Sequence, residues 1–159
     1  MIIDDHEVVR RGIAEVVERS DGMTVVAEAA SVAEGVRRAE LVRPQVLLVD
    51  LQLPDGTGID IMSRLRESLP ESRSIVLTSF DDDDALAEAL EVGAAAYLLK
   101  SVRGAEIADV VRAVAAGRTL LDERTVDVHV GRLRKAVNNG RQPDVIRTIR
   151  GAGYAIRED

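Results

Sequence analysis

The chain has 159 residues, 46% of them hydrophobic and 31% charged, with a formal net charge of −7, which fits one domain with a packed core or one domain with a small appendage. The absence of Cys excludes disulfides, thiolate nucleophiles and Cys-based zinc sites. No apolar run approaches the roughly 20 residues that span a bilayer and no basic-then-apolar leader opens the chain, so we expect a cytoplasmic protein without membrane contact.

Apolar runs of strand length alternate with segments of helical periodicity over the first 117 residues. Strands are predicted at residues 1–3, 25–27, 46–49, 75–77 and 96–99. The helices between them are predicted at residues 7–19, 31–42, 59–69, 83–90 and 107–114, the second of them opening on a capping box. Successive strand–helix units predict a five-stranded parallel α/β sheet, doubly wound with helices on both faces.

The alternation stops after Gly117. A helix is predicted from about residue 124 to 138, followed by a loop at 139–143 and a β-hairpin with strands at 145–149 and 154–156. Residues 1–121 carry 13 basic and 22 acidic side chains, whereas residues 122–159 carry 8 and 6. We therefore divide the chain into domains at 1–120 and 121–159. The basic excess of the tail either favours a polyanion or is too weak to matter.

Polar side chains follow four of the five predicted strands. Asp4 and Asp5 come after the first strand, Asp50 after the third, Thr78 after the fourth and Lys100 after the fifth. Because the carboxyl ends of parallel strands meet at one edge of a sheet, where ligands bind in such folds, we expect these side chains to converge.

Converging carboxylates repel one another unless a cation joins them. Oxygen ligands alone, without Cys or a second-shell His, indicate a hard ion, and Mg²⁺ fits best because it takes one or two carboxylates plus phosphate oxygens. Such a site lets a carboxylate attack phosphorus and form an acyl phosphate. Asp50, alone after the central strand, is the expected nucleophile. Lys100 and Thr78 are expected to contact phosphoryl oxygens, and Asp4 and Asp5 to bind the ion.

Each of these residues has a simpler interpretation when it is taken alone. An Asp after a strand is usually a helix cap or a turn residue, and Asp4 and Asp5 are well placed to cap the first helix. Lys100 alone reads as a surface lysine. The combination is far more specific than its members.

Four segments together resemble the receiver domain of bacterial response regulators: residues 3–7 (IDDHE), 48–56 (LVDLQLPDG), 76–79 (VLTS) and 97–100 (YLLK). The resemblance covers about residues 1–120. Two further segments, DHEVVRRG and AAGRTLLD, are similar to the NarL/FixJ subfamily, especially its actinobacterial dormancy-type regulators. The resemblance implies a CheY-like, flavodoxin-like fold with strand order 2-1-3-4-5. It also implies that the first strand normally starts earlier, so Met1 is expected to be a truncated start.

The same resemblance assigns roles to the residues. Asp50 is implied as the phosphoryl acceptor of a phosphorelay, with Mg²⁺-dependent self-phosphorylation and dephosphorylation as the only catalysis. Asp5 is implied as a direct Mg²⁺ ligand, Asp4 as a mainly water-mediated one, and the main-chain carbonyl of Gln52 as another. Thr78 and Tyr97 are the implied switch pair, and the fourth helix, fifth strand and fifth helix form the readout face.

The tail resembles a second family. Residues 124–135 and 145–154 are similar to the recognition helix and wing of an OmpR/PhoB-type winged-helix DNA-binding domain, without its front half. The resemblance implies DNA contacts from Arg132, Arg134, Lys135, Arg147 and Arg150. Because NarL-type receivers carry a different output domain, we expect a truncated or chimeric regulator. The alternative is that the tail helix packs on the receiver or on a second subunit.

Three functions are compared. The leading one is a response regulator phosphorylated by a histidine kinase that controls transcription through double-stranded DNA. The second is a stand-alone receiver or adaptor whose phosphorylation controls homodimerisation without DNA binding. The third, an aspartate-nucleophile phosphatase, is disfavoured because Gln52 stands where such an enzyme needs an acid. His6 is expected to be a structural residue, and His129 a packing or phosphate-contact residue.

Overall fold

A parallel sheet of five strands is the centre of the first of two units, Met1–Leu121. The computed structural model describes residues 1–79, 83–120, 146–149 and 153–156. The sheet order is β2-β1-β3-β6-β7, which in chain order of these strands is 2-1-3-4-5 and confirms the predicted fold. Its strands are β1 (Ile2–Ile3), β2 (Glu28–Ala29), β3 (Val46–Asp50), β6 (Arg73–Thr78) and β7 (Ala96–Leu99).

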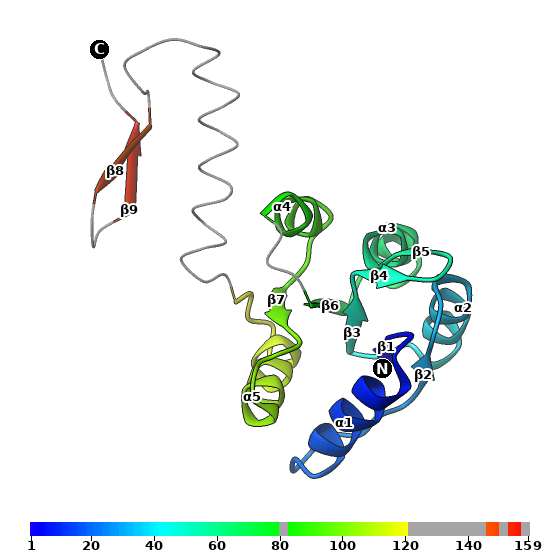
Figure 1. The fold of residues 1–159 in the computed structure, drawn as a ribbon. Helices are drawn as coiled ribbons and strands as arrows, with labels where there is room; N and C mark the ends of the chain where they lie inside the picture. The colour runs from blue at the N-terminus through cyan, green and yellow to red at the C-terminus, as the bar shows by residue number, and fades with distance from the viewer. Residues whose placement is uncertain (80–82, 121–145, 150–152, 157–159) are drawn as a thin grey trace. The chain divides into compact units, whose positions relative to one another are not determined.

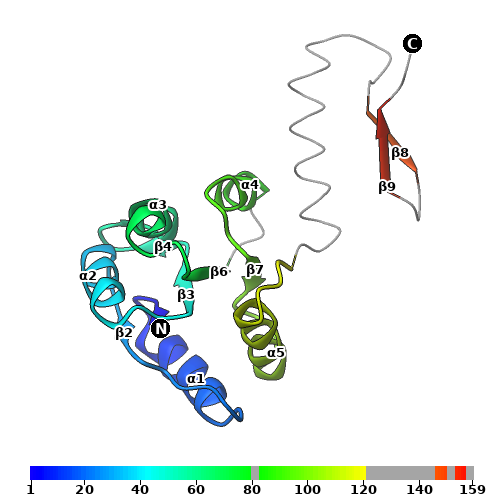
Figure 2. The ribbon, with the colours of Figure 1, turned by 180° about the vertical axis from the view of Figure 1, so that it is seen from behind.

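Helices cover both faces of this sheet (Figure 1). Side chains of α1 and α5 pack on one face, and those of α2, α3 and α4 pack on the other, an arrangement also visible from behind (Figure 2). All residues of β3 are buried, which explains its apolar run without alternation. The helices are α1 (Glu7–Glu18), α2 (Val32–Val42), α3 (Gly58–Ser68), α4 (Asp83–Glu91) and α5 (Gly104–Ala115).

Local sequence signals set the ends of two helices. Ser31 caps α2 as predicted, its hydroxyl accepting from the Glu34 N–H, while the Glu34 carboxylate reaches back to the N–H of Ala30. The α3 helix begins with a full capping box between Thr57 and Asp60, which we did not predict. The Thr57–Asp60 box fixes the end of the loop that follows β3, and the Asp55 carboxylate, which accepts from the N–H groups of Val32 and Ala33, holds this loop against the start of α2.

The second strand lies later than predicted. β2 is Glu28–Ala29 rather than residues 25–27, because β1 contributes only Ile2 and Ile3 as partners in the sheet. A small antiparallel hairpin, β4 (Gln52–Leu53) with β5 (Gly56–Thr57), was also not predicted. It occupies the turn between Asp50 and α3.

The second unit, Asp122–Asp159, contains an antiparallel pair of strands, β8 (Ile146–Ile149) and β9 (Gly153–Ile156). These strands confirm the predicted hairpin. The predicted helix at residues 124–138 lies outside the described residues. Within the described part of the chain, no helix combines the length and apolar character needed to cross a membrane.

Candidate functional site

The predicted convergence of strand ends is present in the structure. The ammonium Nζ of Lys100 lies 2.6 Å from Oδ2 of Asp50 and 2.7 Å from Oδ2 of Asp4. Both carboxylates are buried, with exposed fractions of 0% for Asp4 and 4% for Asp50. Three residues that lie far apart in the sequence therefore form one charged centre at the carboxyl edge of the sheet.

The sheet itself sets the positions of these side chains. Asp50 is the last residue of β3 and pairs in register with Leu77. The N–H of Asp4 donates to the carbonyl of Ala29 (3.1 Å), which holds it just beyond β1. The N–H of Lys100 donates to the carbonyl of Thr78 (2.7 Å) just beyond β7. Hydrogen bonds between neighbouring strand ends thus place the acids and the amine at the same level.

Burial and mutual charge shift the acid–base properties of the centre. Burial raises the pKa of the Asp50 carboxyl, against the hydrogen bond and charge of Lys100, while the neighbouring Asp4 raises it further. Burial would lower the pKa of Lys100, but the carboxylates of Asp4 and Asp50 outweigh it and the net shift is upward. One ammonium thus serves two buried carboxylates and stays protonated.

Asp5 and His6 complete an acidic cluster with Asp4 and Asp50. One ligand atom from each of the four residues lies within 4.8 Å of the others. The His6 Nδ1 is 2.9 Å from Oδ1 of Asp5 and 3.4 Å from Oδ1 of Asp4. The expectation of oxygen ligands alone stays a prediction, and the structure places the His6 imidazole beside these acids. The only sequence signal that could have placed His6 in this cluster is its position directly after Asp5, but that position also begins α1.

The donor set of the cluster fits a divalent cation such as Mg²⁺. The cluster holds three carboxylates, and the ammonium of Lys100 pairs with only two of them, so the centre keeps an excess of negative charge that a bound ion would neutralise. The N–H of Gln52 donates to Oδ1 of Asp50 (3.3 Å), which orients the carboxylate from the hairpin side. The role of the Gln52 carbonyl as an ion ligand stays a prediction.

Thr78 and Tyr97 lie on neighbouring strands close to this centre. Thr78 is the last residue of β6 and is buried. Tyr97 is half-buried on β7 and pairs in register with Val76, two residues before Thr78. Because residues two apart share a face of a strand, Thr78 and Tyr97 belong to the same face of the sheet. Their expected role as a switch pair stays a prediction.

The predicted DNA-contacting residues are described only in part. Arg147 lies on β8 and pairs in register with Ala155 of β9. The other residues predicted to contact DNA lie outside the described residues: Arg132, Arg134, Lys135 and Arg150.

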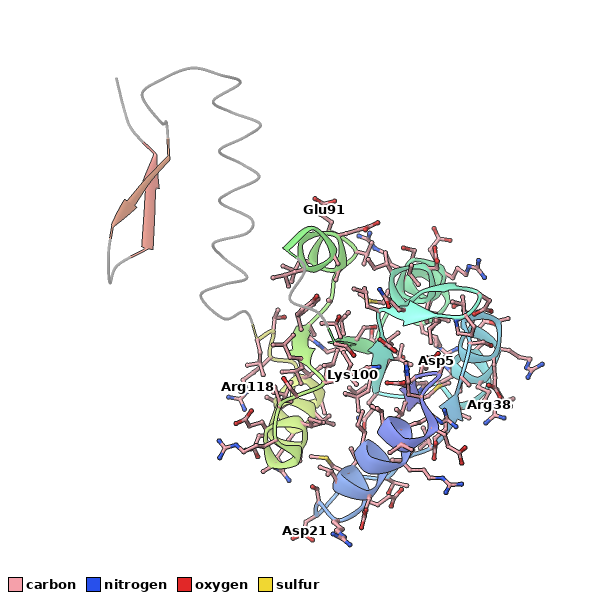
Figure 3. All side chains as sticks on the ribbon, viewed as in Figure 1. Asp5, Asp21, Arg38, Glu91, Lys100 and Arg118 are labelled. Atoms are coloured by element: carbon pink, nitrogen blue, oxygen red, sulfur yellow. The ribbon has the colours of Figure 1, made fainter. Side chains whose placement is uncertain are left out.

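A cavity of about 300 Å³ lies away from the acidic cluster. Its lining includes Met1, Met23, Val46 and Val111, and none of the clustered acids or Lys100. Figure 3 shows Asp5 and Lys100 in the central part of the first unit, whereas Asp21, which lines this cavity, lies beyond the far end of α1. The acidic cluster therefore lies at the edge of the sheet opposite to this cavity.

Two protein families match the sequence. The family described as "Response regulator receiver domain" matches residues 1–112, and the family described as "Transcriptional regulatory protein, C terminal" matches residues 95–156.

Among curated proteins, the chain is 42% identical over 135 residues to the DNA-binding transcriptional activator DevR/DosR of Mycobacterium tuberculosis. The aligned residues cover 85% of this chain and 62% of that protein. It is 40% identical over 139 residues to the transcriptional regulatory protein LiaR of Bacillus subtilis, covering 87% and 66%. The chain thus spans less than two thirds of the length of these relatives.

Among solved structures, a two-component response regulator of the LuxR family from Aurantimonas sp. superposes with a TM-score of 0.75 at 31% identity, covering 84% of this chain and 96% of that one. The REC domain of AraT, a response regulator from Geobacillus stearothermophilus, superposes with a TM-score of 0.67 at 35% identity, covering 73% and 91%. The first unit therefore has close structural relatives over nearly their whole length.

Proposed function

The chain belongs to the response regulator receiver domain family, and we propose that it is the phosphorylation-dependent switch of a two-component system, with Asp50 accepting the phosphoryl group of a histidine kinase. The observation that supports this proposal is the bridge from Lys100 to both Asp50 and Asp4 at the end of the sheet. A carboxylate beside a fixed ammonium is what phosphoryl transfer to an acid requires, because the transition state is stabilised mainly by position and charge.

The proposed reaction joins one Asp50 oxygen to phosphorus while the bond from phosphorus to the donor's imidazole nitrogen breaks. The donor nitrogen keeps the electron pair, and the product is an aspartyl phosphate. Lys100 would turn from Asp50 to a phosphoryl oxygen while keeping Asp4 as its partner. Thr78 would donate its hydroxyl to another phosphoryl oxygen. Mg²⁺, bound by Asp5, Asp50 and the Gln52 carbonyl with Asp4 acting through water, would supply charge neutralisation.

The switch would be read out by the region around Thr78 and Tyr97. Phosphorylation would draw Thr78 toward the new phosphoryl group and favour a second orientation of Tyr97 beside it, which couples the site to the face made by α4, β7 and α5. The position of both residues on one face of neighbouring strands supports this coupling. Dimerisation through that face is the simplest consequence, so a second copy of the chain is one proposed partner.

Transcriptional control through DNA is the proposed output. The match of residues 95–156 to a C-terminal transcriptional regulatory family, the β8–β9 hairpin and the basic excess of residues 122–159 support it. Within this proposal the tail is the recognition helix and wing of an OmpR/PhoB-type domain, joined to a NarL-type receiver in a chimeric regulator. Arg147 would belong to the wing. Double-stranded DNA as partner implies a cytoplasmic location.

Incubation with acetyl phosphate and Mg²⁺, followed by intact mass measurement, tests the receiver proposal. The native chain is expected to gain one phosphoryl group, and Asp50→Asn none. Asp109→Asn, on the exposed side of α5, is the matched control and should behave like the native chain. A native chain that stays unmodified, or an Asp50→Asn chain that gains the same mass, would refute the proposal.

The mobility of duplex DNA tests the output separately. A shift that weakens steeply with added salt is expected for the native chain, because bound phosphates release counterions. Arg147→Gln should weaken the shift. A chain that is phosphorylated and dimerises without any DNA shift would support the adaptor function instead.

A further inference from the structure

Arg10 of α1 contacts two other elements of the first unit. Its Nη1 donates to the main-chain carbonyl of Asp4 (2.7 Å), and its Nε donates to Oε2 of Glu28 (2.9 Å), the first residue of β2. Because helical side chains lean toward the N-terminus of their helix, a long side chain four residues after the N-cap residue His6 can reach the end of β1. Arg10 therefore joins α1, β2 and the residue that follows β1.

The Arg10 side chain is charged and largely buried. It is 17% exposed, and Glu28 supplies the opposite charge. Arg11, the next residue, is 77% exposed and pairs with Glu7 on the same helix. A buried charge is costly without a partner, whereas an exposed pair contributes little to stability. The contacts of Arg10 are therefore a fixed part of the fold, unlike the surface pair of Arg11.

The carbonyl that Arg10 holds belongs to the peptide unit between Asp4 and Asp5. Because a peptide unit is planar, fixing its carbonyl also fixes the direction in which the chain continues to Asp5. β1 ends at Ile3 and has only two residues. The N–H of Asp4 still pairs with the carbonyl of Ala29, but the carbonyl of Asp4 takes its partner from α1. Arg10 thus continues the role of strand pairing where the acids begin.

The side chain of Asp4 is held as firmly as its main chain. Its Oδ1 accepts from the N–H of His6 (2.8 Å), and its Oδ2 is paired with Lys100. We propose that Arg10 is a positioning residue for the phosphorylation site: by fixing the Asp4–Asp5 peptide, it keeps both acids where the cation is bound. This inference rests on the proposed function, because it concerns how the same site is held. Arg10 acts through the main chain and contacts no reacting atom.

Two simpler roles for Arg10 make different predictions. A purely structural contact between α1 and β2 predicts that loss of the guanidinium lowers stability alone. A purely electrostatic role predicts tighter Mg²⁺ binding after its loss, because a nearby positive charge repels the ion. Positioning predicts the opposite sign, namely weaker Mg²⁺ binding and slower phosphorylation although a repelling charge has been removed.

Calorimetric titration with Mg²⁺ and the initial rate of phosphorylation by acetyl phosphate separate these roles. Arg10→Gln is expected to weaken Mg²⁺ binding about tenfold or more and to slow phosphorylation by a similar factor. Arg10→Lys keeps the charge but not the planar fork that serves two acceptors, so it should be impaired as well. Arg11→Gln removes the same charge from the neighbouring exposed position and should leave both quantities unchanged.

Arg38→Gln controls for lost stability. Arg38 of α2 donates to the main-chain carbonyl of Glu28 (2.7 Å) and pairs with Glu34, so it also joins a helix to β2. With urea unfolding as the measure of stability, this variant should lose stability without losing Mg²⁺ affinity. Glu28→Ala leaves Arg10 in place without its ion-pair partner. It should weaken Mg²⁺ binding less than Arg10→Gln does, and it provides the test if Arg10→Gln does not fold.

A folded Arg10→Gln chain with the Mg²⁺ affinity and phosphorylation rate of Arg11→Gln would overturn the inference, as would tighter Mg²⁺ binding. If the native chain is phosphorylated and Arg10→Gln is phosphorylated equally fast, only the role of Arg10 is wrong. If the native chain binds Mg²⁺ but stays unmodified, the proposed function fails, and the Mg²⁺ affinities still decide the role of Arg10. A native chain that neither binds Mg²⁺ nor is modified would refute both.

Discussion

Gly58 packs directly against the main-chain carbonyl of Asp50. A Cβ on Gly58 would lie 2.5 Å from that oxygen and 2.8 Å from a methyl group of Val49. The obstacle is the backbone of the central strand, which cannot turn away as a flexible side chain can. A shift of the start of α3 would therefore displace the end of β3, and with it the Asp50 carboxylate.

Gly58→Ala is expected to destabilise the first unit and to impair phosphorylation of Asp50. The added methyl group must push α3 away or shift the end of β3, and overpacking of this kind typically costs about 1–3 kcal/mol. Urea unfolding followed by circular dichroism measures the loss of stability, and the acetyl phosphate reaction measures the loss of modification.

Gly12→Ala is the matched control for this substitution. Gly12 lies within α1, and a Cβ at that position meets no atom within 4 Å. Since Ala is the better helix former, this variant should gain up to about 1 kcal/mol. A Gly58→Ala chain as stable as Gly12→Ala would contradict the close packing of Gly58 on Asp50.

Asp50→Asn is expected to raise the free energy of unfolding at neutral pH when divalent ions are chelated. Burial raises the pKa of Asp50 against the opposing effect of Lys100. The folded chain therefore holds this proton more tightly than the unfolded chain. The Asp50 carboxyl makes its full contribution to stability below its pKa in the unfolded chain, about 4. This contribution is lost as the pH rises through its raised pKa in the folded chain. At neutral pH the charged carboxylate costs stability, which the neutral amide avoids.

Added Mg²⁺ should reverse this order. An ion that binds only the folded state stabilises it by about 2.7 kcal/mol at a hundredfold excess over its dissociation constant. The native chain should gain this stabilisation, and Asp50→Asn should gain much less because one ligand is lost. Thermal unfolding with and without Mg²⁺ measures both effects. Equal gains in the two chains would show that the ion does not use Asp50.

The parts of the site that follow from sheet geometry could be predicted from the sequence. Asp4 and Lys100 each follow a strand of the same parallel sheet, Asp50 ends another, and the carboxyl ends of such strands share an edge. The strands β3 and Ala96–Leu99 could also be predicted, because their apolar patterns depend on burial within a single strand.

The parts that depend on contacts between elements could not be predicted. The place of β2 depends on which residues of β1 are available to pair with it, and not on the apolar run at residues 25–27. The turn of the His6 imidazole toward Asp5 depends on the path of the chain after β1. The β4–β5 hairpin is too short to show a strand pattern.

Asp55→Ala is expected to lower the melting temperature by loosening the loop after Asp50 from α2. The Asp55 carboxylate accepts hydrogen bonds from the N–H groups of Val32 (2.6 Å) and Ala33 (3.0 Å) at the start of that helix. These hydrogen bonds lower the pKa of Asp55, which shows that they favour its charged form. Their loss leaves two N–H groups of the first turn without this acceptor. Differential scanning calorimetry measures the change.

Asp109→Ala is the comparison for this loss of charge. The carboxylate of Asp109 lies 3.3 Å from Arg112 one turn later on the exposed side of α5, and such surface pairs contribute little to stability. The Asp55 variant should therefore melt at a lower temperature than the Asp109 variant. Equal melting temperatures would mean that the capping of α2 by Asp55 contributes nothing.

The contribution of the Met1 amino group to the free energy of unfolding is expected to fall as the pH is lowered from above 8 to below 6. This group donates to the carbonyl of Val46 (2.9 Å) in a buried position, and burial lowers its pKa from 8.0 to about 6. The folded chain therefore releases this proton more readily than the unfolded chain. Its favourable contribution is present above the unfolded pKa and is lost as the pH falls through the folded one.

A chain with an acetylated amino terminus isolates this effect. The difference between the two pKa values corresponds to roughly 3 kcal/mol between the ends of this pH range. The acetylated chain keeps an N–H that can donate to Val46 but has no proton to bind, and the cavity lined by Met1 offers room for the acetyl group. Urea unfolding at several pH values should show a steeper loss of stability in the unmodified chain. Parallel pH profiles would exclude a buried, titrating amino group, since every other ionisable group is common to both chains.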